Sequence, residues 1–304
     1  MQPSENRAAS KNQSSISPDL TQPVLDSVLF PSDFSQGSQT AFYHALKAAL
    51  IAKSRFTILH LSPDAAAAWT EFPGVRDTLE RWNLLPPNSP RSAVPQLGID
   101  VRKVVAREDR PVRAVIQDLK ANPADLIVLA THAKGGKAGW HGSADNEPLA
   151  RKVGQMTLYI PDGVPGFVSA QDGSISLTKI LIPIAPKPDP QPAINAAARM
   201  AARLNLPQGT FTLLYIGEAA AMPAVQCPTV PGWEWKKVTR SGDVVTGIVE
   251  AAKQESADLL LMTTDGRNGF LDALRGSHSE RILRSATCPL MTVPEGSLAE
   301  GALR

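Results

Sequence analysis

Two segments of the chain repeat one pattern closely enough to indicate a tandem duplication. ADLIVLATHAKGG begins at Ala124 and ADLLLMTTDGRNG begins at Ala257, an offset of 133 (257 − 124). An earlier echo relates VLFPSD, from Val28, to ILIPIA, from Ile180, at an offset of 152 (180 − 28). Such self-similarity predicts two copies of one unit of ~130–140 residues, a common domain size. The offsets differ because the first copy carries a longer insertion between the two landmarks.

These landmarks predict how the chain is divided. We expect a disordered tail over residues 1–24, a first domain over 25–161, a linker over 162–177, a second domain over 178–296 and a short tail over 297–304. The first segment is rich in Ser, Gln, Asn and Pro, a composition typical of disorder, and it lacks the apolar stretch of a signal peptide. The linker is rich in Gly and Ser.

Each copy alternates short apolar runs with helical patterns, which predicts an α/β fold. The runs DLIVLA and DLLLM are apolar on both faces, as in parallel strands covered by helices on both sides. We expect two open, doubly wound, Rossmann-like sheets of five mostly parallel strands each. The expected strands cover 27–31, 55–61, 99–105, 125–131 and 156–161, then 179–183, 210–216, 235–239, 258–263 and 290–293. The expected helices cover 39–53, 111–121 and about 147–153, then 192–204, 244–255 and 277–285.

Composition excludes several classes of function. The formal net charge is +2 and aromatic residues make up 5%, so neither a basic patch nor a base-stacking surface for nucleic acid is indicated. No apolar run approaches the ~18 residues of a membrane span. Cys227 and Cys288 share no CxxC spacing, and two free thiols suit a reducing cytosol, which predicts a cytoplasmic protein. No HExxH motif or paired histidines predict a metal site.

The loop after the first strand of copy one carries a carboxylate. In doubly wound sheets, ligands bind outside the carboxyl ends of the strands at the point where the strand order reverses. Asp33, within PSDFS, follows such a strand end. Its carboxylate suits either a ribose hydroxyl or adenine amino group of a ligand, or the N-cap of the following helix.

The loop after the fourth strand of copy two carries glycines. Gly266 permits close backbone approach, and Gly276-Ser277 opens a helix whose free N–H groups suit an anion. SHSE, from Ser277 to Glu280, also matches a capping box, which is compatible with a bound phosphate. Neither GxGxxG nor GxxxxGK[ST] is present, and no GxSxG elbow indicates a nucleophile. The sequence therefore predicts a binding protein rather than an enzyme.

Together the segments VLFPSDFSQGSQTAFYHALKAA, ADLIVLATHAKGG, WHGSADNEPLAR and ADLLLMTTDGRNGFLDALRGSHSERILRSATCPLMTVP resemble the universal stress proteins in their tandem two-domain form. The resemblance implies an adenine nucleotide alpha hydrolase-like fold that binds ATP, or ADP or AMP, with Mg²⁺ only as the companion of the nucleotide. It places adenine near the first two strand ends and the phosphates on the glycine loop.

Nucleotide-binding members of this family carry a glycine, two residues, a glycine, nine residues and then Gly-Ser or Gly-Thr, with an aspartate after the first strand. In copy two the implied site residues are Pro183, Ala185, Thr263, Asp265, Gly266, Gly276, Ser277, His278 and Ser279. In copy one they are Pro31, Asp33, Ala130, His132, Ala133, Gly142 and Ser143. Copy two keeps Gly266 and Gly276-Ser277, but Thr263 replaces the first glycine and Ala185 replaces the aspartate. Copy one keeps Asp33, but Ala130 and Ala133 replace both glycines.

The resemblance also implies partners and a role. The last strands, over 156–161 and 290–293, are expected to pair within one chain as an intramolecular pseudo-dimer, and a homodimer is a further option. The leading hypothesis is a stress-response protein that binds ATP without substantial turnover. The alternatives are a scaffold on the same fold that binds no nucleotide, which the alanine substitutions favour, and a slow ATP hydrolase.

Overall fold

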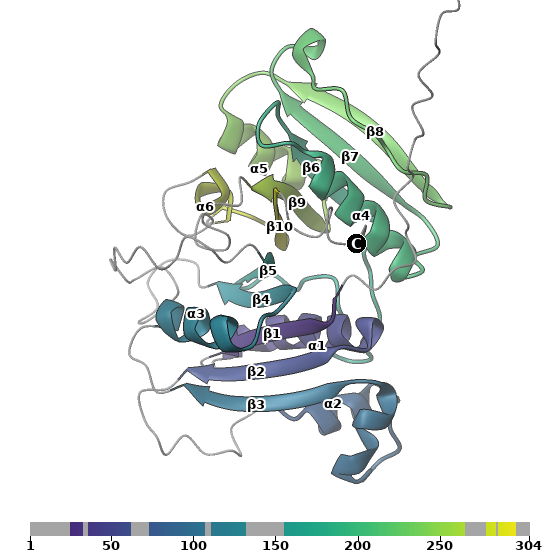
Figure 1. Cartoon of the computed structure of the whole chain (residues 1–304). Helices are drawn as coiled ribbons and strands as arrows, with labels where there is room; N and C mark the ends of the chain where they lie inside the picture. Colours follow the sequence, from purple (N-terminus) through teal and green to yellow (C-terminus); the bar gives the residue numbers. More distant parts are fainter. Residues whose placement is uncertain are drawn as a thin grey trace, which may run out of the picture.

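The computed structural model describes residues 25–32, 36–61, 73–106, 111–131, 155–264, 278–283 and 285–295. Strands and helices alternate along both halves (Figure 1). The first half contains β1 (Ser27–Ser32), α1 (Gln39–Ala52), β2 (Arg55–Leu61), α2 (Val75–Arg81), β3 (Asp100–Ala106), α3 (Pro111–Ala121), β4 (Leu126–Thr131) and β5 (Met156–Pro161). The second contains β6 (Lys179–Ile184), α4 (Gln191–Arg203), β7 (Gly209–Ile216), β8 (Trp233–Arg240), α5 (Val244–Gln254), β9 (Leu259–Thr264), α6 (His278–Leu283) and β10 (Leu290–Pro294).

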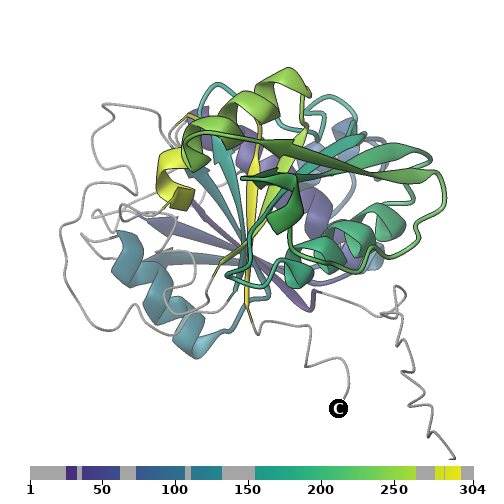
Figure 2. The ribbon, with the colours of Figure 1, turned by 90° about the horizontal axis from the view of Figure 1, so that it is seen from above.

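The predicted α/β class is confirmed. The two sets of five strands, expected to pair through their last strands, join at β5 and β10 into one continuous ten-stranded sheet. Its order is β3-β2-β1-β4-β5-β10-β9-β6-β7-β8. Nine strand pairs join these strands, and all are parallel except β5 with β10, which is antiparallel. A sheet this wide twists strongly, and the view from above shows its strands fanned around one another (Figure 2).

The antiparallel pair joins the two halves. Leu158 is the register partner of Met291, and Thr157 that of Thr292. Leu158 and Met291 are also 133 residues apart (291 − 158), so they occupy equivalent positions in the two copies. An internal two-fold relation between the copies therefore passes close to this residue pair.

In each half, an aspartate carboxylate accepts hydrogen bonds from backbone N–H groups at the start of the first strand. Asp125 Oδ2 accepts hydrogen bonds from the N–H groups of Asp26 (2.7 Å) and Ser27 (3.0 Å). Asp258 Oδ2 accepts equivalent bonds from Thr178 (2.7 Å) and Lys179 (2.9 Å). The aspartate of each repeated Ala-Asp pair thus satisfies backbone donors at the amino end of the sheet. This end is opposite to the edge where ligands bind in such folds.

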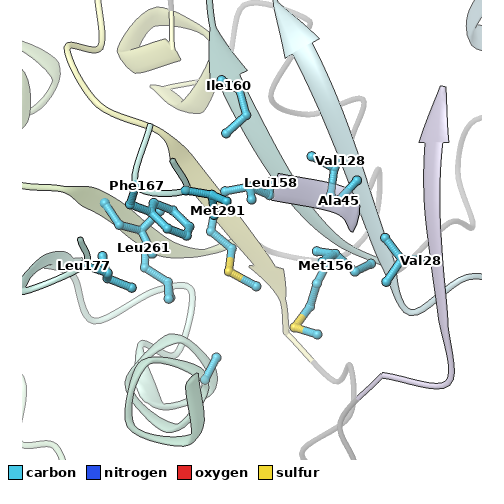
Figure 3. Close-up of a cluster of buried hydrophobic side chains, with 14 of the residues drawn as sticks. Val28, Ala45, Val128, Met156, Leu158, Ile160, Phe167, Leu177, Leu261 and Met291 are labelled. Carbon is cyan, nitrogen blue, oxygen red and sulfur yellow. The ribbon is translucent and has the colours of Figure 1, made fainter. Parts of the chain in front are cut away.

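Helices cover both faces of the sheet and bury an apolar layer on each. One layer packs α1 and α4 against alternate strand residues, and it includes the seam residues Leu158 and Met291 (Figure 3). The other packs α3, α5 and α6 against the opposite face. Coverage of both faces explains why inner strands such as β1, β4 and β9 are apolar without alternation.

The connection between the halves is packed rather than free. Val168 and Ile175 form an isolated antiparallel bridge, and Phe167 and Val168 are buried. His44 of α1 accepts hydrogen bonds at Nε2 from the N–H groups of both residues (3.0 and 3.2 Å). His44 therefore holds the connecting segment against α1.

Most predicted elements agree with the structure within one or two residues. One of the larger differences is β8, which begins at Trp233 instead of residue 235; Trp233 and Trp235 both stack on Phe211 of β7. The helix expected near 147–153 and both tails lie outside the described residues. No helix among the described residues is long and apolar enough to cross a membrane.

Candidate functional site

The two predicted sites correspond to equivalent positions in the strand order, at the carboxyl ends of the central strands β1 and β6. β1 lies between β2 and β4, and β6 lies between β7 and β9. Each central strand therefore has neighbours whose connections run to opposite sides, which creates a crevice at the carboxyl ends. Pro31 and Ala130 stand at or near those ends in the first half. Pro183, Ala185 and Thr263 do so in the second.

The remaining predicted residues are only partly within the described chain. His278 and Ser279 begin α6, but their side chains lie outside the description. The other predicted residues lie outside the described residues altogether: Asp33, His132, Ala133, Gly142, Ser143, Asp265, Gly266, Gly276 and Ser277. The roles assigned to these side chains stay predictions.

Two adjacent threonines at the end of β9 have different surroundings. Side chains alternate between the faces of a strand, so Thr263 points to the α4 side and Thr264 to the α5 and α6 side. Thr263 Oγ1 accepts a hydrogen bond from the Ala193 N–H (3.2 Å). Thr264 is 6% exposed, and its Oγ1 finds no hydrogen-bond partner among the described residues. A buried hydroxyl without a partner is rare and calls for an explanation.

The N-terminus of α4 has no free donor for an anion. The Gln191 N–H donates to Asp189 Oδ1 (2.9 Å), Pro192 has no N–H, and Ala193 donates to Thr263. The Ile194 N–H donates to the Pro190 carbonyl (3.2 Å). The hydroxyl of Thr263, predicted to lie near the ribose, is thus engaged in capping α4. The start of α4 therefore offers no free backbone donor to an anion on the Thr263 side of β9.

Two hydrogen bonds between the Gln191 side chain and the Gln226 backbone close part of the crevice in the second half. Gln191 Nε2 donates to the Gln226 carbonyl (2.8 Å), and the Gln226 N–H donates to Gln191 Oε1 (2.9 Å). Gln226 belongs to the long β7–β8 connection, which packs over the α4 side of the sheet through Val230 and Val225. The space beside the ends of β6 and β7, where the resemblance places adenine, is therefore bridged by the protein itself.

The equivalent edge of the first half holds a buried polar group that the sequence analysis did not predict. Ser32 and Ser38 are joined through their hydroxyls (2.9 Å), and His60 Nδ1 lies 3.2 Å from the Ser32 carbonyl. All three side chains are buried. The signal in the sequence was PSDFS, in which Ser32 stands beside Asp33, but only the β1–β2 pairing brings His60 to it.

The two cysteines and the possible metal ligands can be judged from their surroundings. Burial raises the pKa of the Cys288 thiol to about 12 and also raises that of Cys227, so neither is a ready nucleophile. Within the described residues, no group of three or more His, Cys, Asp or Glu side chains is placed to hold a metal ion.

The chain thus has an open, doubly wound α/β sheet, a class of fold in which ligands bind outside the carboxyl ends of the strands. The model of the Universal stress protein family matches residues 25–146 and 229–294. These segments make up more than half of the chain, and the chain belongs to this family. The second match begins at residue 229, so β6, α4 and β7 lie outside it.

Individual relatives show the same likeness. A universal stress protein of Methanocaldococcus jannaschii is 44% identical over 46 residues, which is 15% of this chain and 27% of that relative. The match thus spans about a quarter of the relative's length. The crystal structure of a universal stress protein from Archaeoglobus fulgidus DSM 4304 has a TM-score of 0.54 at 14% identity, covering 88% of this chain and 98% of that one.

The fold also occurs outside stand-alone stress proteins. The cytoplasmic domain of a prokaryotic cation chloride cotransporter has a TM-score of 0.51 at 12% identity, covering 91% of this chain and 99% of that one. At such low identity both structural matches establish the fold alone.

Proposed function

We propose that this universal stress protein binds an adenine nucleotide, ATP in the first place, at the carboxyl ends of β6 and β9, and that it acts in stress response without substantial turnover. One observation carries the proposal. At this switch point Thr264, whose buried hydroxyl finds no partner among the described residues, stands directly before DGRNGFLDALRGS, the better-kept glycine pattern of the two copies. A ligand oxygen near this loop would satisfy the Thr264 hydroxyl.

The proposed roles follow the two sides of the crevice. The backbone of Gly266, Gly276 and Ser277, with His278 and Ser279, would hold the phosphates through N–H and hydroxyl donors. Pro183, Ala185 and Asp265 would line the sugar side. Thr263 contributes backbone and shape, because its hydroxyl caps α4. Mg²⁺ would arrive only with the nucleotide.

The first half offers a second, weaker site at the ends of β1 and β4. Asp33 would accept from the ribose or adenine there, with Pro31, Ala130, His132, Ala133, Gly142 and Ser143 around the ligand. The proposal places the protein in the cytoplasm, where free thiols such as those of Cys227 and Cys288 persist. The two halves would act as an intramolecular pseudo-dimer, and two such chains would be able to form a homodimer.

Thermal unfolding with and without ATP, ADP and AMP tests the proposal. A ligand that binds only the folded state stabilises it by about 2.7 kcal/mol at 100 times its Kd. We expect an upward shift of Tm that saturates with ATP. The absence of any shift with all three nucleotides contradicts nucleotide binding.

Variants then locate the site. Gly276→Asp places a carboxylate against the phosphates and should abolish the shift if the second half holds the ligand. Asp33→Ala should do so only if the first half does.

Ala185→Asp restores the acidic residue of the family pattern and should strengthen ATP binding, whereas Ala185→Asn, its neutral isostere, should strengthen it less. No gain from Ala185→Asp would argue against nucleotide binding between β6 and β9.

A scaffold that binds no nucleotide is the second candidate, and a specific observation favours it. Two hydrogen bonds within the chain, between the Gln191 side chain and the Gln226 backbone, span the space where adenine would bind. If ATP binds only after Gln191→Ala, which removes the side chain that bonds to the Gln226 backbone, the native chain works as a scaffold. A third candidate, slow ATP hydrolysis, predicts phosphate release above that of a Gly276→Asp variant, whereas binding alone predicts equal release.

A further inference from the structure

An apolar cavity of about 150 Å³ lies where the two halves meet, away from both predicted nucleotide sites. Its floor is the seam of the sheet, with Leu126, Met156, Leu158 and Met291. Its sides are one face of α1 and one face of α4, and its end wall is the connecting segment at Phe167, Val168 and Ile175. Figure 3 shows Met291 beside Leu158, with Phe167 on one side and Met156 on the other.

The two helices line the cavity with equivalent positions of the repeat. The α1 residues are His44, Lys47, Ala48, Ile51 and Ala52, and the residues of α4 and its C-cap are Ala196, Arg199, Met200, Arg203 and Leu204. Each α4 residue follows its α1 counterpart by 152 positions, as in 199 − 47, which is the offset of the first strands. The paired Leu158 and Met291 complete this symmetry. The cavity thus lies on the internal two-fold relation, and the joining of two domains creates it.

Two cations stand at equivalent positions, 47 and 199, but their surroundings differ. The Lys47 ammonium lies 5.8 Å from the centre of the Trp82 ring. Burial lowers the pKa of Lys47, and the nearby Asp172 carboxylate opposes part of this lowering. Arg199 is half-buried, and its Nε has no hydrogen-bond partner among the described residues. Burial lowers the pKa of Arg199, yet a guanidinium stays protonated in proteins. A charge beside an apolar cavity without a partner is costly to bury.

The other titratable groups on the cavity are accounted for. His44 is neutral, because burial lowers its pKa to about 4, and its Nε2 already accepts from Phe167 and Val168. Arg203 has an interaction of its own. Arg199 is therefore the group that a ligand would complement.

We propose that this cavity binds a small amphipathic carboxylate, whose apolar part fills the space over Leu158 and Met291 and whose carboxylate pairs with Arg199. The volume matches apolar cavities that take up a molecule of about the size of benzene. A carboxylate suits the two-pronged donor geometry of a guanidinium and neutralises its single charge. The site belongs to the joined halves, so neither domain could form it alone.

Methyl NMR of the full-length protein tests the proposal, because methionines report on the cavity. Met156, Met200 and Met291 line it, whereas Met222 and Met262 do not. With ¹³C-methyl methionine, titration with hexanoate should shift the first three signals and leave the other two unchanged. Hexan-1-ol and hexylammonium serve as neutral and cationic probes of equal chain length, and we expect hexanoate to bind at least about tenfold more tightly than either, as a charge-assisted hydrogen bond implies.

Two variants at equivalent positions separate charge from shape. Arg199→Leu should lower the affinity for hexanoate at least about tenfold and leave that for hexan-1-ol unchanged. Lys47→Gln, the matched control, should change hexanoate affinity by less than about twofold, because Lys47 faces Trp82 and Asp172. Equal binding of hexanoate and hexan-1-ol, no shift of the three cavity signals, or equal shifts of the Met222 and Met262 signals would each overturn the proposal.

Discussion

Thr263 and Thr264 show how neighbouring residues of one type acquire different tasks. Thr263 caps α4 through the Ala193 N–H, and Thr264 has a buried hydroxyl with no partner among the described residues. The sequence identified Thr263 as the replacement for a family glycine, and it gave no signal for Thr264. Only the alternation of faces at the end of β9 distinguishes the two.

Valine substitutions should separate these roles, because valine nearly matches threonine in shape. Thr263→Val leaves the Ala193 N–H unpaired and should lower the free energy of unfolding by about 1–2 kcal/mol. Thr264→Val removes an unsatisfied hydroxyl and should leave stability unchanged or raise it, while weakening ATP binding. Urea unfolding and ATP titration of both variants provide the measurement. Equal loss of stability in the two would refute the assignment.

His44 predicts a pH dependence of stability. Its pKa falls from 6.5 to about 4 on folding because burial opposes the charged ring. Between these values the unfolded chain binds the additional proton, so this contribution to stability is complete above pH 6.5 and is lost as the pH falls towards 4. The difference corresponds to about 3 kcal/mol.

Urea unfolding at pH 7 and pH 4.5 measures this contribution. His44→Gln cannot titrate, so it should be less stable than the native protein at pH 7 and should lose less stability on acidification. An unchanged pH dependence in the variant would show that other groups cause it.

At the scale of elements, the connecting segment is the part that the sequence described least well. Its glycines and serines suggested a linker, yet Phe167 and Val168 are buried against α1. Gly166 has a φ of +71°, and a Cβ there would overlap the His44 ring. A glycine in a linker thus serves a close packing contact, which composition does not reveal.

Two glycines of this segment form a matched pair. Gly163 has a left-handed backbone with a φ of +76°, and nothing lies within 4 Å of the position of a Cβ there. The cost of Gly163→Ala is therefore backbone strain alone. This substitution should lower the free energy of unfolding by about 1–2 kcal/mol. Gly166→Ala adds the overlap with His44 and should lower it further. Thermal unfolding of both variants compares them, and a smaller effect at Gly166 would contradict the packing described.

At the scale of the whole molecule, the seam predicts that both halves unfold together. β5 and β10 share ladder bonds, and the layer of α1 and α4 crosses the seam. Calorimetry should show one transition whose calorimetric and van't Hoff enthalpies agree. Leu158→Ala, at a buried seam position, should lower the stability of the whole by about 2–5 kcal/mol without splitting the transition.

Leu84→Ala is the control for this experiment, because Leu84 is 41% exposed and should contribute within about 0.5 kcal/mol. Two separate transitions, with Leu158→Ala moving one of them alone, would show that the halves are independent.

The sequence by itself determined the duplication, the α/β class and most strand positions, because both-face burial and helical periodicity are local signals that each segment carries. It also placed the predicted site at the ends of the central strands, since the family pattern is local too. Tertiary structure decided what depends on partners distant in the chain. The contact of His44 with the connecting segment and the Gln191–Gln226 bridge join residues that are far apart in the chain. The register of the seam between β5 and β10 and the cavity beside Arg199 arise only when the two copies fold against each other.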